Sequence, residues 1–282
     1  MISKLTGAIL RALMVVLLIA TPSIMLPAIH ADTSQIVVLL GLLAAGFTFV
    51  EYNSNYPSLV EFRDAPPFNR VRFLALFASV FVLSAIASGK ANPTTITLLF
   101  ELIGGRVSEL LDFPYSPVRL VVLMMPTDTN AALIADVRIA AGLSYFVSIL
   151  SLGLFVLILR FKGWPSQTGG FNVWTNLPTF DPTSGGDVVD RLNRDATGNL
   201  ILGFLLPFII PAFVKLASDY INPVSLENQH TLIWMMTAWA FLPASLLMRG
   251  IAMNRVAQMI VNQRRRAYAA AHGEDVHGAV HA

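Results

Sequence analysis

Six long apolar stretches dominate this chain, and they leave it few ways to fold other than across a membrane. They cover residues 7–29, 35–52, 72–88, 139–159, 198–215 and 231–248. A helix needs about 20 apolar residues to cross the hydrocarbon core of a bilayer, which is close to the length of each stretch. The sequence therefore predicts an all-α integral membrane protein with six transmembrane helices.

Lys and Arg are distributed very unevenly among the segments that connect these stretches. If the N-terminus is cytoplasmic, fourteen of the nineteen basic residues fall on the cytoplasmic side. The outer side then carries only Lys90, Arg106, Arg119, Arg138 and Lys215. Because basic residues are retained in cytoplasmic loops, this asymmetry predicts that both termini are cytoplasmic.

Composition narrows the class of protein further. Hydrophobic residues make up 55% of the chain and charged residues only 13%, against about a quarter in soluble domains. We therefore expect one polytopic membrane domain over residues 1–271, and the net charge of +2 gives no reason to expect a nucleic-acid partner. The absence of cysteine excludes disulfides, thiolate nucleophiles, iron–sulfur clusters and Cys-type zinc sites. The bias toward Ala, Leu, Val and Arg indicates a bacterial protein, so the expected location is the inner (cytoplasmic) membrane.

The first stretch has a second interpretation. Lys4 and Arg11, the run MVVLLIA and the later PAIHADT have the layout of a signal peptide cleaved after Ala31. Cleavage would leave a protein of five helices. The apolar run continues to Ile29, which is longer than the usual apolar core of a signal peptide and favours a transmembrane helix.

The longest outer connection begins with an amphipathic pattern over about residues 95–112. It predicts a helix that lies in the outer interface of the membrane. One interpretation makes this helix a docking surface for a partner or a lid over a lateral cavity, and the other packs it on the outer ends of its own bundle. The charged residues on it are the candidates for partner binding: Glu101, Arg106, Glu109 and Asp112.

Two further segments lie outside the six stretches. Residues 117–126 are apolar but too short to span a bilayer, and they predict either a re-entrant dip or a short strand-like segment packed against the bundle. Near the C-terminus, Arg264, Arg265 and Arg266 are candidates for binding anionic lipid, at about 1 kcal/mol each. We expect residues 272–282 to form a disordered cytoplasmic tail.

Ionisable residues are missing from the centres of all six stretches, which argues against an ion-coupled pump or transporter. His30 and His230 both fall at outer ends of stretches. They predict either axial ligands of one b-type haem, or a quinone site, or two separate interfacial histidines. No metal site is predicted, because the histidines of the tail are irregularly spaced.

Catalytic motifs are not found. The sequence contains no GxSxG, HExxH, Walker or GxGxxG pattern, so we expect no enzymatic activity. Pro207 and Pro211 should kink the fifth helix, as Pro22 and Pro243 should kink the first and sixth. Such kinks free backbone carbonyls that could line a site, or they simply fit the helices around their neighbours.

Taken together, these features predict a non-catalytic multi-pass membrane protein that acts as an accessory or assembly subunit of a larger membrane complex. Its expected partners are the bilayer and other integral membrane subunits. One alternative is a permease or channel component, which would need a continuous polar cavity near Pro207 and Pro211. A second alternative is a haem- or quinone-binding protein, which would need His30 and His230 close together.

Overall fold

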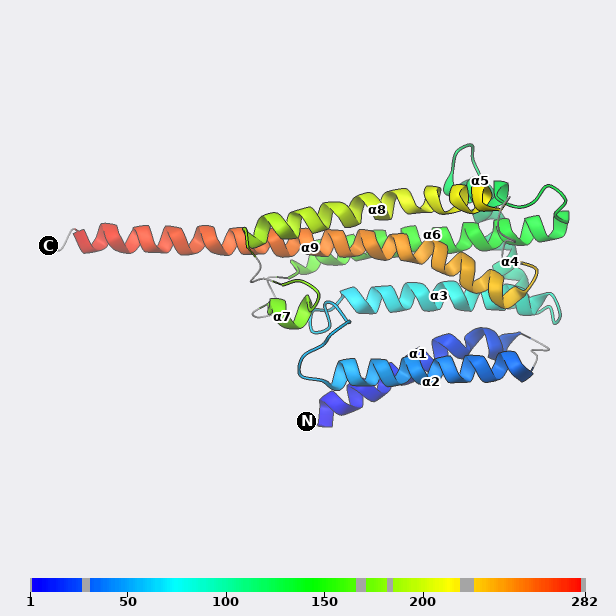
Figure 1. Ribbon diagram of the computed structural model, residues 1–282, viewed down its shortest axis with the longest axis horizontal. Helices are drawn as coiled ribbons and strands as arrows, with labels where there is room; N and C mark the ends of the chain where they lie inside the picture. Colours follow the sequence, from blue (N-terminus) through cyan, green and yellow to red (C-terminus); the bar gives the residue numbers. More distant parts are fainter. Residues whose placement is uncertain (1, 27–30, 166–170, 182–184, 219–225, 280–282) are drawn as a thin grey trace.

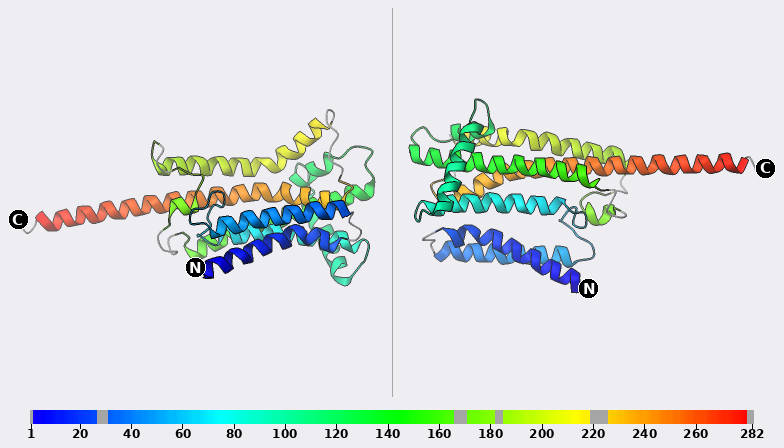
Figure 2. Two further views of the ribbon diagram at one scale, coloured as in Figure 1. Left: turned by 60° about the horizontal axis from the view of Figure 1, so that its bottom comes forward. Right: turned by 180° about the vertical axis from the view of Figure 1, so that it is seen from behind.

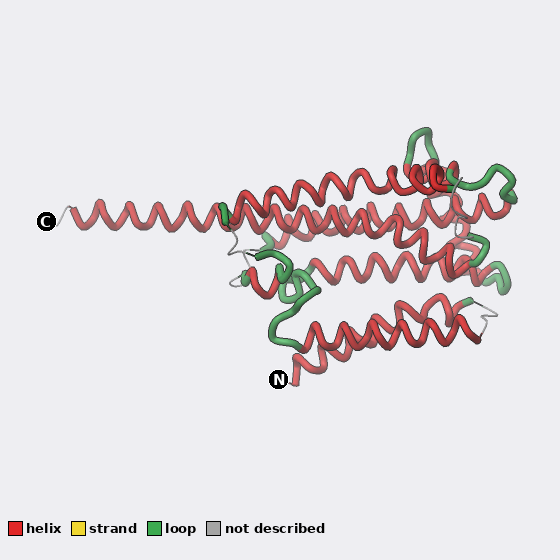
Figure 3. Tube along the Cα trace, in the orientation of Figure 1, coloured by secondary structure: helices red, strands yellow, loops and turns green. Residues whose placement is uncertain are grey.

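The computed structural model describes residues 2–26, 31–165, 171–181, 185–218 and 226–279, which form helices and loops without a strand among them (Figure 3). The helices are α1 (Ile2–Met25), α2 (Ala31–Asn53), α3 (Phe68–Gly89), α4 (Thr95–Leu111), α5 (Pro117–Leu123), α6 (Ala131–Lys162), α7 (Val173–Asn176), α8 (Val188–Ala217) and α9 (Gln229–Ala279).

Six of these helices, α1, α2, α3, α6, α8 and α9, are long and apolar enough to cross a membrane. They run along a common axis, and α9 extends past the others at one end (Figure 1). The prediction of an all-helical protein with six membrane-spanning candidates is confirmed for the part of the chain described. The cytoplasmic location of the termini and the interfacial position of residues 95–112 stay predictions.

The bundle has two distinct ends. The start of α1, the short helix α7 and the C-terminal part of α9 lie at one end, which we call the basic end (Figure 1). The helices α4 and α5 lie at the opposite end, where α4 crosses the direction of α3 and α6 (Figure 2). We call this the α4–α5 end.

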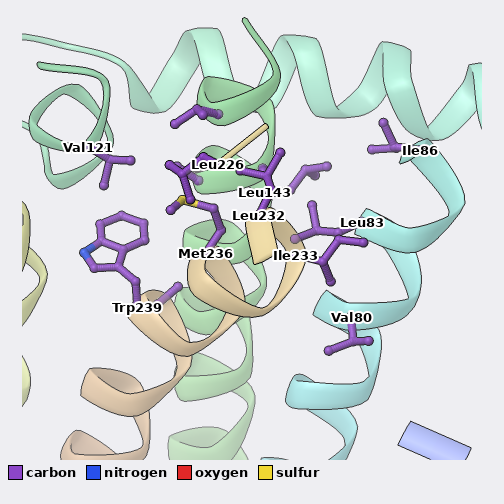
Figure 4. Packing of buried hydrophobic residues seen from close by; sticks show 14 of the residues in the cluster. Val80, Leu83, Ile86, Val121, Leu143, Leu226, Leu232, Ile233, Met236 and Trp239 are labelled. Carbon is purple, nitrogen blue, oxygen red and sulfur yellow. The ribbon is translucent and has the colours of Figure 1, made fainter. Parts of the chain in front are cut away.

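Buried apolar side chains form two clusters, one toward each end. The first joins α3, α5, α6 and α9 at the α4–α5 end, and Val80, Leu83, Val121, Ile233, Met236 and Trp239 belong to it (Figure 4). The second lies at the basic end and includes Phe62, Phe68, Phe155, Leu177, Met248 and Met253. The helices α3, α6 and α9 contribute buried residues to both clusters, so these three helices form the centre of the fold.

The helices α8 and α9 approach each other closely at two glycines. A Cβ atom on Gly203 would lie 2.7 Å from the carbonyl oxygen of Pro243, and one on Gly250 would lie 2.8 Å from that of Ala196. No other residue fits there without moving a backbone. Small residues drive helix association in membranes because they let backbones come together.

Side-chain caps begin several helices. Thr94 and Thr97 form a capping box at the start of α4, and Asn130 caps α6 through the amide of Ala132 at 2.9 Å. Asp187 caps α8 through the amide of Val189. These oxygens satisfy amides that have no partner within the first helical turn.

Some elements differ from the predictions. Residues 117–123 form a short helix capped by Ser116 with a proline in its first turn, so the strand-like alternative for this segment was wrong. The helix α8 runs without a break from Val188 into the apolar stretch that begins near residue 198. The helix α9 continues to Ala279, into the segment 272–282, whose disorder stays a prediction.

Candidate functional site

The predicted histidine site is only half described. His30 lies outside the described residues. His230, near the start of α9, is partly buried, and its Nε2 has no hydrogen-bond partner among the described residues. The pairing of the two histidines, and with it the haem or quinone, therefore stays a prediction. No group of three or more His, Cys, Asp or Glu side chains in the searched part of the chain is placed to hold a metal ion.

The four charged residues predicted to bind a partner fall into two groups. Glu101, Arg106 and Glu109 are exposed, with Arg106 Nη1 3.4 Å from Glu109 Oε2. Asp112 is different, because its side chain is 7% exposed and pairs with Arg119 at 2.8 Å and Arg138 at 2.9 Å. Asp112 therefore joins α4 to α5 and α6 within the chain, and a docking role for the four residues stays a prediction.

The helix α4 packs through its small residues. Gly104 and Ser108 are buried, and a Cβ atom on Gly142 of α6 would lie 2.6 Å from the Cα atom of Ser108. The helix α4 thus contacts α6 through Gly104 and Ser108, while Phe100, Val107 and Leu111 pack against the first core cluster. As a result α4 turns a set of large apolar side chains outward: Ile96, Leu98, Leu99, Leu102, Ile103 and Leu110.

The arginines predicted to bind anionic lipid also differ from one another. Arg264 Nη1 donates to Asp187 Oδ2 at 2.8 Å, while Arg265 and Arg266 are exposed. The hydrogen bond from Arg264, together with that from the Val189 amide, lowers the pKa of the Asp187 carboxyl from its ordinary value. Arg264 therefore links α9 to the start of α8, and lipid binding by the triplet stays a prediction.

At the basic end, two loops that are far apart in the sequence form one structure, residues 54–67 and 171–181, which we call the loop cap. The Phe62 amide donates to the Asn176 carbonyl at 2.6 Å, and the Asp64 amide donates to Asn176 Oδ1 at 3.1 Å. The Phe62 ring lies 4.5 Å from that of Phe68 and 5.8 Å from that of Trp164. The first loop therefore packs against other parts of the protein.

An ion pair between Glu61 and Arg249 connects the loop cap to α9. Arg249 donates to both carboxylate oxygens of Glu61, from Nε at 2.6 Å and from Nη2 at 2.8 Å. The Thr179 hydroxyl donates to the same carboxylate at 2.7 Å. Two parallel bonds from one guanidinium fix both distance and orientation, so Glu61 sets how the cap sits on α9.

A second carboxylate organises the first loop. Glu51, buried at the end of α2, accepts hydrogen bonds from the amides of Ser58, Leu59 and Val60 at 3.0 to 3.2 Å. Arg63 Nη1 donates to the Glu51 carbonyl at 2.8 Å. Glu51 and Glu61 thus accept hydrogen bonds from neighbouring donors within the chain, which is the arrangement of a structural network.

The α4–α5 end contains a cavity of about 640 Å³ between α5, α8 and α9. Val121 from α5, Pro211 from α8 and Trp239 from α9 line it. Figure 4 shows Val121, Leu226, Met236 and Trp239 gathered at this place. A volume of this size lies within the range of about 300 to 1,000 Å³ that ligand pockets occupy.

The kink in α8 shapes this cavity. Pro211 has no amide hydrogen, so the carbonyl of Pro207, four residues earlier, loses its helical donor. Trp239 Nε1 supplies the missing hydrogen bond at 3.2 Å. The indole is thereby held at the cavity wall, with the Tyr145 ring 5.7 Å from its own.

Sequence analysis found the prolines of this site but missed most of its wall. Pro207 and Pro211 are a visible signal, whereas the methionines at 124, 125, 235 and 236 belong to segments that read only as apolar. The wall of the cavity is mostly apolar, and the described residues that line it all belong to the α4–α5 end of the bundle. It therefore differs from the continuous polar cavity that a channel would need, and it can bind an apolar molecule without reacting with it.

Comparison with known proteins identifies no relative of this chain. No known protein family, no curated protein and no solved structure matches the chain.

Proposed function

We propose that this protein is a non-catalytic multi-pass protein of a bacterial inner membrane, and that it acts as an accessory or assembly subunit of a larger membrane complex. The observation that carries the proposal is the isolation of α2. Only 11% of its apolar stretch is buried, against 56% in α9. Among the described helices, α2 contacts α1 alone, and α1 joins the hairpin to α3 and α9.

The outer face of α2 is shaped for another helix. Leu42, Leu43, Phe47 and Val50 are exposed along it, and Gly46 lies among them. Nothing lies within 4 Å of the position that a Cβ atom on Gly46 would take. The glycine is thus the floor of a notch between large apolar side chains.

Lipid alone gives little reason for such a notch. Membrane helices associate through close van der Waals packing at small residues, because lipid tails are as apolar as leucine and exert no hydrophobic drive. A notch at Gly46 offers a partner helix this closer approach. The partner we propose is therefore an apolar transmembrane helix of another integral membrane protein.

The test compares two exposed glycines. Gly46 in α2 and Gly153 in α6 both lie in apolar stretches with open space at the Cβ position. The tagged protein is extracted from native membranes in mild detergent, and its complexes are weighed by native mass spectrometry. We expect a stoichiometric membrane partner with the wild type and with Gly153→Leu, and about tenfold less with Gly46→Leu, since overpacking costs roughly 1–3 kcal/mol.

A photo-crosslinking residue in place of Phe47 tests whether the partner binds at this face of α2. A cross-link from this position to the same partner supports binding at α2. A wild-type protein that is recovered alone, or a complex that Gly46→Leu leaves intact, would overturn the proposal.

A transport component is the second candidate, and the cavity beside Pro211 is the observation that favours it. Reconstitution in liposomes tests it by flux of an apolar or amphipathic solute. Flux that is lost when Ala217 of the cavity wall is replaced by Trp would support transport, and its absence in the wild type would exclude it.

A further inference from the structure

The cavity at the α4–α5 end has a polarity that changes along the bundle axis. Its apolar wall comes from within helices, at residues such as Val121, Ile210 and Met236, and from the adjoining loops, at Met124, Met125 and Leu226. Its polar residues come from helix ends and loops: Asp128, Thr129, Asn130, Ser218 and Glu227. A membrane lipid has the same order of apolar tail and polar head along the membrane normal.

The apolar part suits a flexible chain. Met124, Met125, Met235 and Met236 line it, and methionine adapts its shape to irregular apolar surfaces. Phe213 and Met235 are also among the exposed large apolar residues, so this wall continues onto the outside of the bundle. A chain entering from the surrounding hydrocarbon would meet apolar side chains throughout.

The polar part has a definite charge. Asp128 and Glu227 both line the cavity, and none of the described lining residues is Lys, Arg or His. Asp128 is exposed, so its carboxylate remains accessible at the rim. A cationic group is attracted to such a rim, and an anionic headgroup is repelled from it.

We propose that this cavity binds a membrane lipid whose headgroup ends in an ammonium group. One acyl chain lies among the methionines and against Trp239, and the ammonium lies beside Asp128. The site is separate from the helix face around Gly46, so it does not depend on the proposed partner.

Tryptophan fluorescence tests the proposal at the cavity itself. Trp164, Trp174 and Trp234 are replaced by Phe, so that only Trp239 remains. This protein is reconstituted with brominated acyl chains on phosphatidylethanolamine, phosphatidylcholine or phosphatidylglycerol. We expect phosphatidylethanolamine to quench Trp239 at a mole fraction up to about fivefold lower than phosphatidylglycerol, since exposed ion pairs contribute up to about 1 kcal/mol.

Matched variants separate the headgroup from the chain. Asp128→Asn should remove the preference between lipids, while Glu109→Gln, an exposed carboxylate on α4 outside the lining, should leave it unchanged. Ala217→Trp should fill the cavity and reduce the retention of every lipid. Ala212→Trp places the same bulk on an exposed position of α8 outside the lining and should leave lipid retention unchanged.

Because added tryptophans contribute their own fluorescence, the two Trp variants are read by native mass spectrometry of the otherwise unchanged protein with each lipid. Retained phosphatidylethanolamine in the wild type that is lost in Ala217→Trp supports the site. Equal quenching by all three lipids, a preference for phosphatidylglycerol, or a preference that survives Asp128→Asn would overturn it. The Gly46 experiment reads the helix face of α2, so the two proposals can fail independently.

Discussion

Individual charged residues hold the basic end together. The Glu61 side chain is 12% exposed and that of Arg249 is 26% exposed, so neither charge is well solvated. Removing one member of a buried pair leaves the other charge without compensation, which costs more than the pair itself contributes. The effect of a substitution at Glu61 should therefore depend strongly on what stands at position 249.

We predict that Glu61→Gln lowers the free energy of unfolding by about 2–3 kcal/mol, somewhat below the cost of breaking a fully buried pair. Arg249→Met should cost a similar amount, and the double variant should cost less than the sum of the two. Denaturant titration in detergent micelles measures all three values and gives the coupling energy from the double-mutant cycle. Strictly additive effects would show that the two side chains act separately.

Such contacts are hidden in the sequence because they join distant positions. Glu61 and Arg249 are separated by 188 residues, and no local spacing connects them. Asp112 looked like a surface residue on an amphipathic helix, yet its carboxylate forms ion pairs with both Arg119 and Arg138. Local signals were more informative at Pro211, where a missing amide hydrogen predicted a free carbonyl.

At the scale of elements, the close contact between α8 and α9 can be tested by substitution of a glycine. Gly203 has the Pro243 carbonyl and Leu247 within 3 Å of its Cβ position, whereas Gly198 on the same helix has nothing within 4 Å. The two glycines therefore form a matched pair in which only one faces a neighbouring backbone.

We predict that Gly203→Leu destabilises the protein by about 1–3 kcal/mol, because the added side chain must push α9 away. Gly198→Leu should be close to neutral. The free energy of unfolding and the distance between spin labels at exposed Leu202 and Leu242 measure the two consequences. An unchanged distance in Gly203→Leu would show that the helices are not held in contact there.

The elements themselves were predictable where length and apolar character decide the outcome. All six membrane-spanning candidates follow from stretches of about 20 apolar residues. The short helix α5 was not identified, because a seven-residue segment that begins with proline and is apolar apart from Arg119 fits several conformations. The contact of α4 with α6 through Gly104 and Ser108 was also missed, since these small residues lie outside its apolar pattern.

At the scale of the whole molecule, the basic residues predict how the protein is oriented in the membrane, and cysteine labelling can test this orientation. The natural absence of cysteine makes single-cysteine labelling straightforward. In intact bacterial cells with a permeabilised outer membrane, Glu109→Cys should react with a membrane-impermeant maleimide, and Arg265→Cys only after the inner membrane is opened. The opposite pattern would reverse the topology that the basic residues predict.

The length of α9 has a consequence for the charges near its end. The helix has 51 residues and spans about 76 Å at 1.5 Å per residue. Arg265 stands about 25 Å along it from Met248, where the predicted span ends. The electric field of an anionic leaflet fades over about 8 Å at physiological salt. A straight, upright α9 would thus hold the exposed Arg265 and Arg266 beyond the reach of this field, where they would meet soluble anionic molecules before they meet lipid.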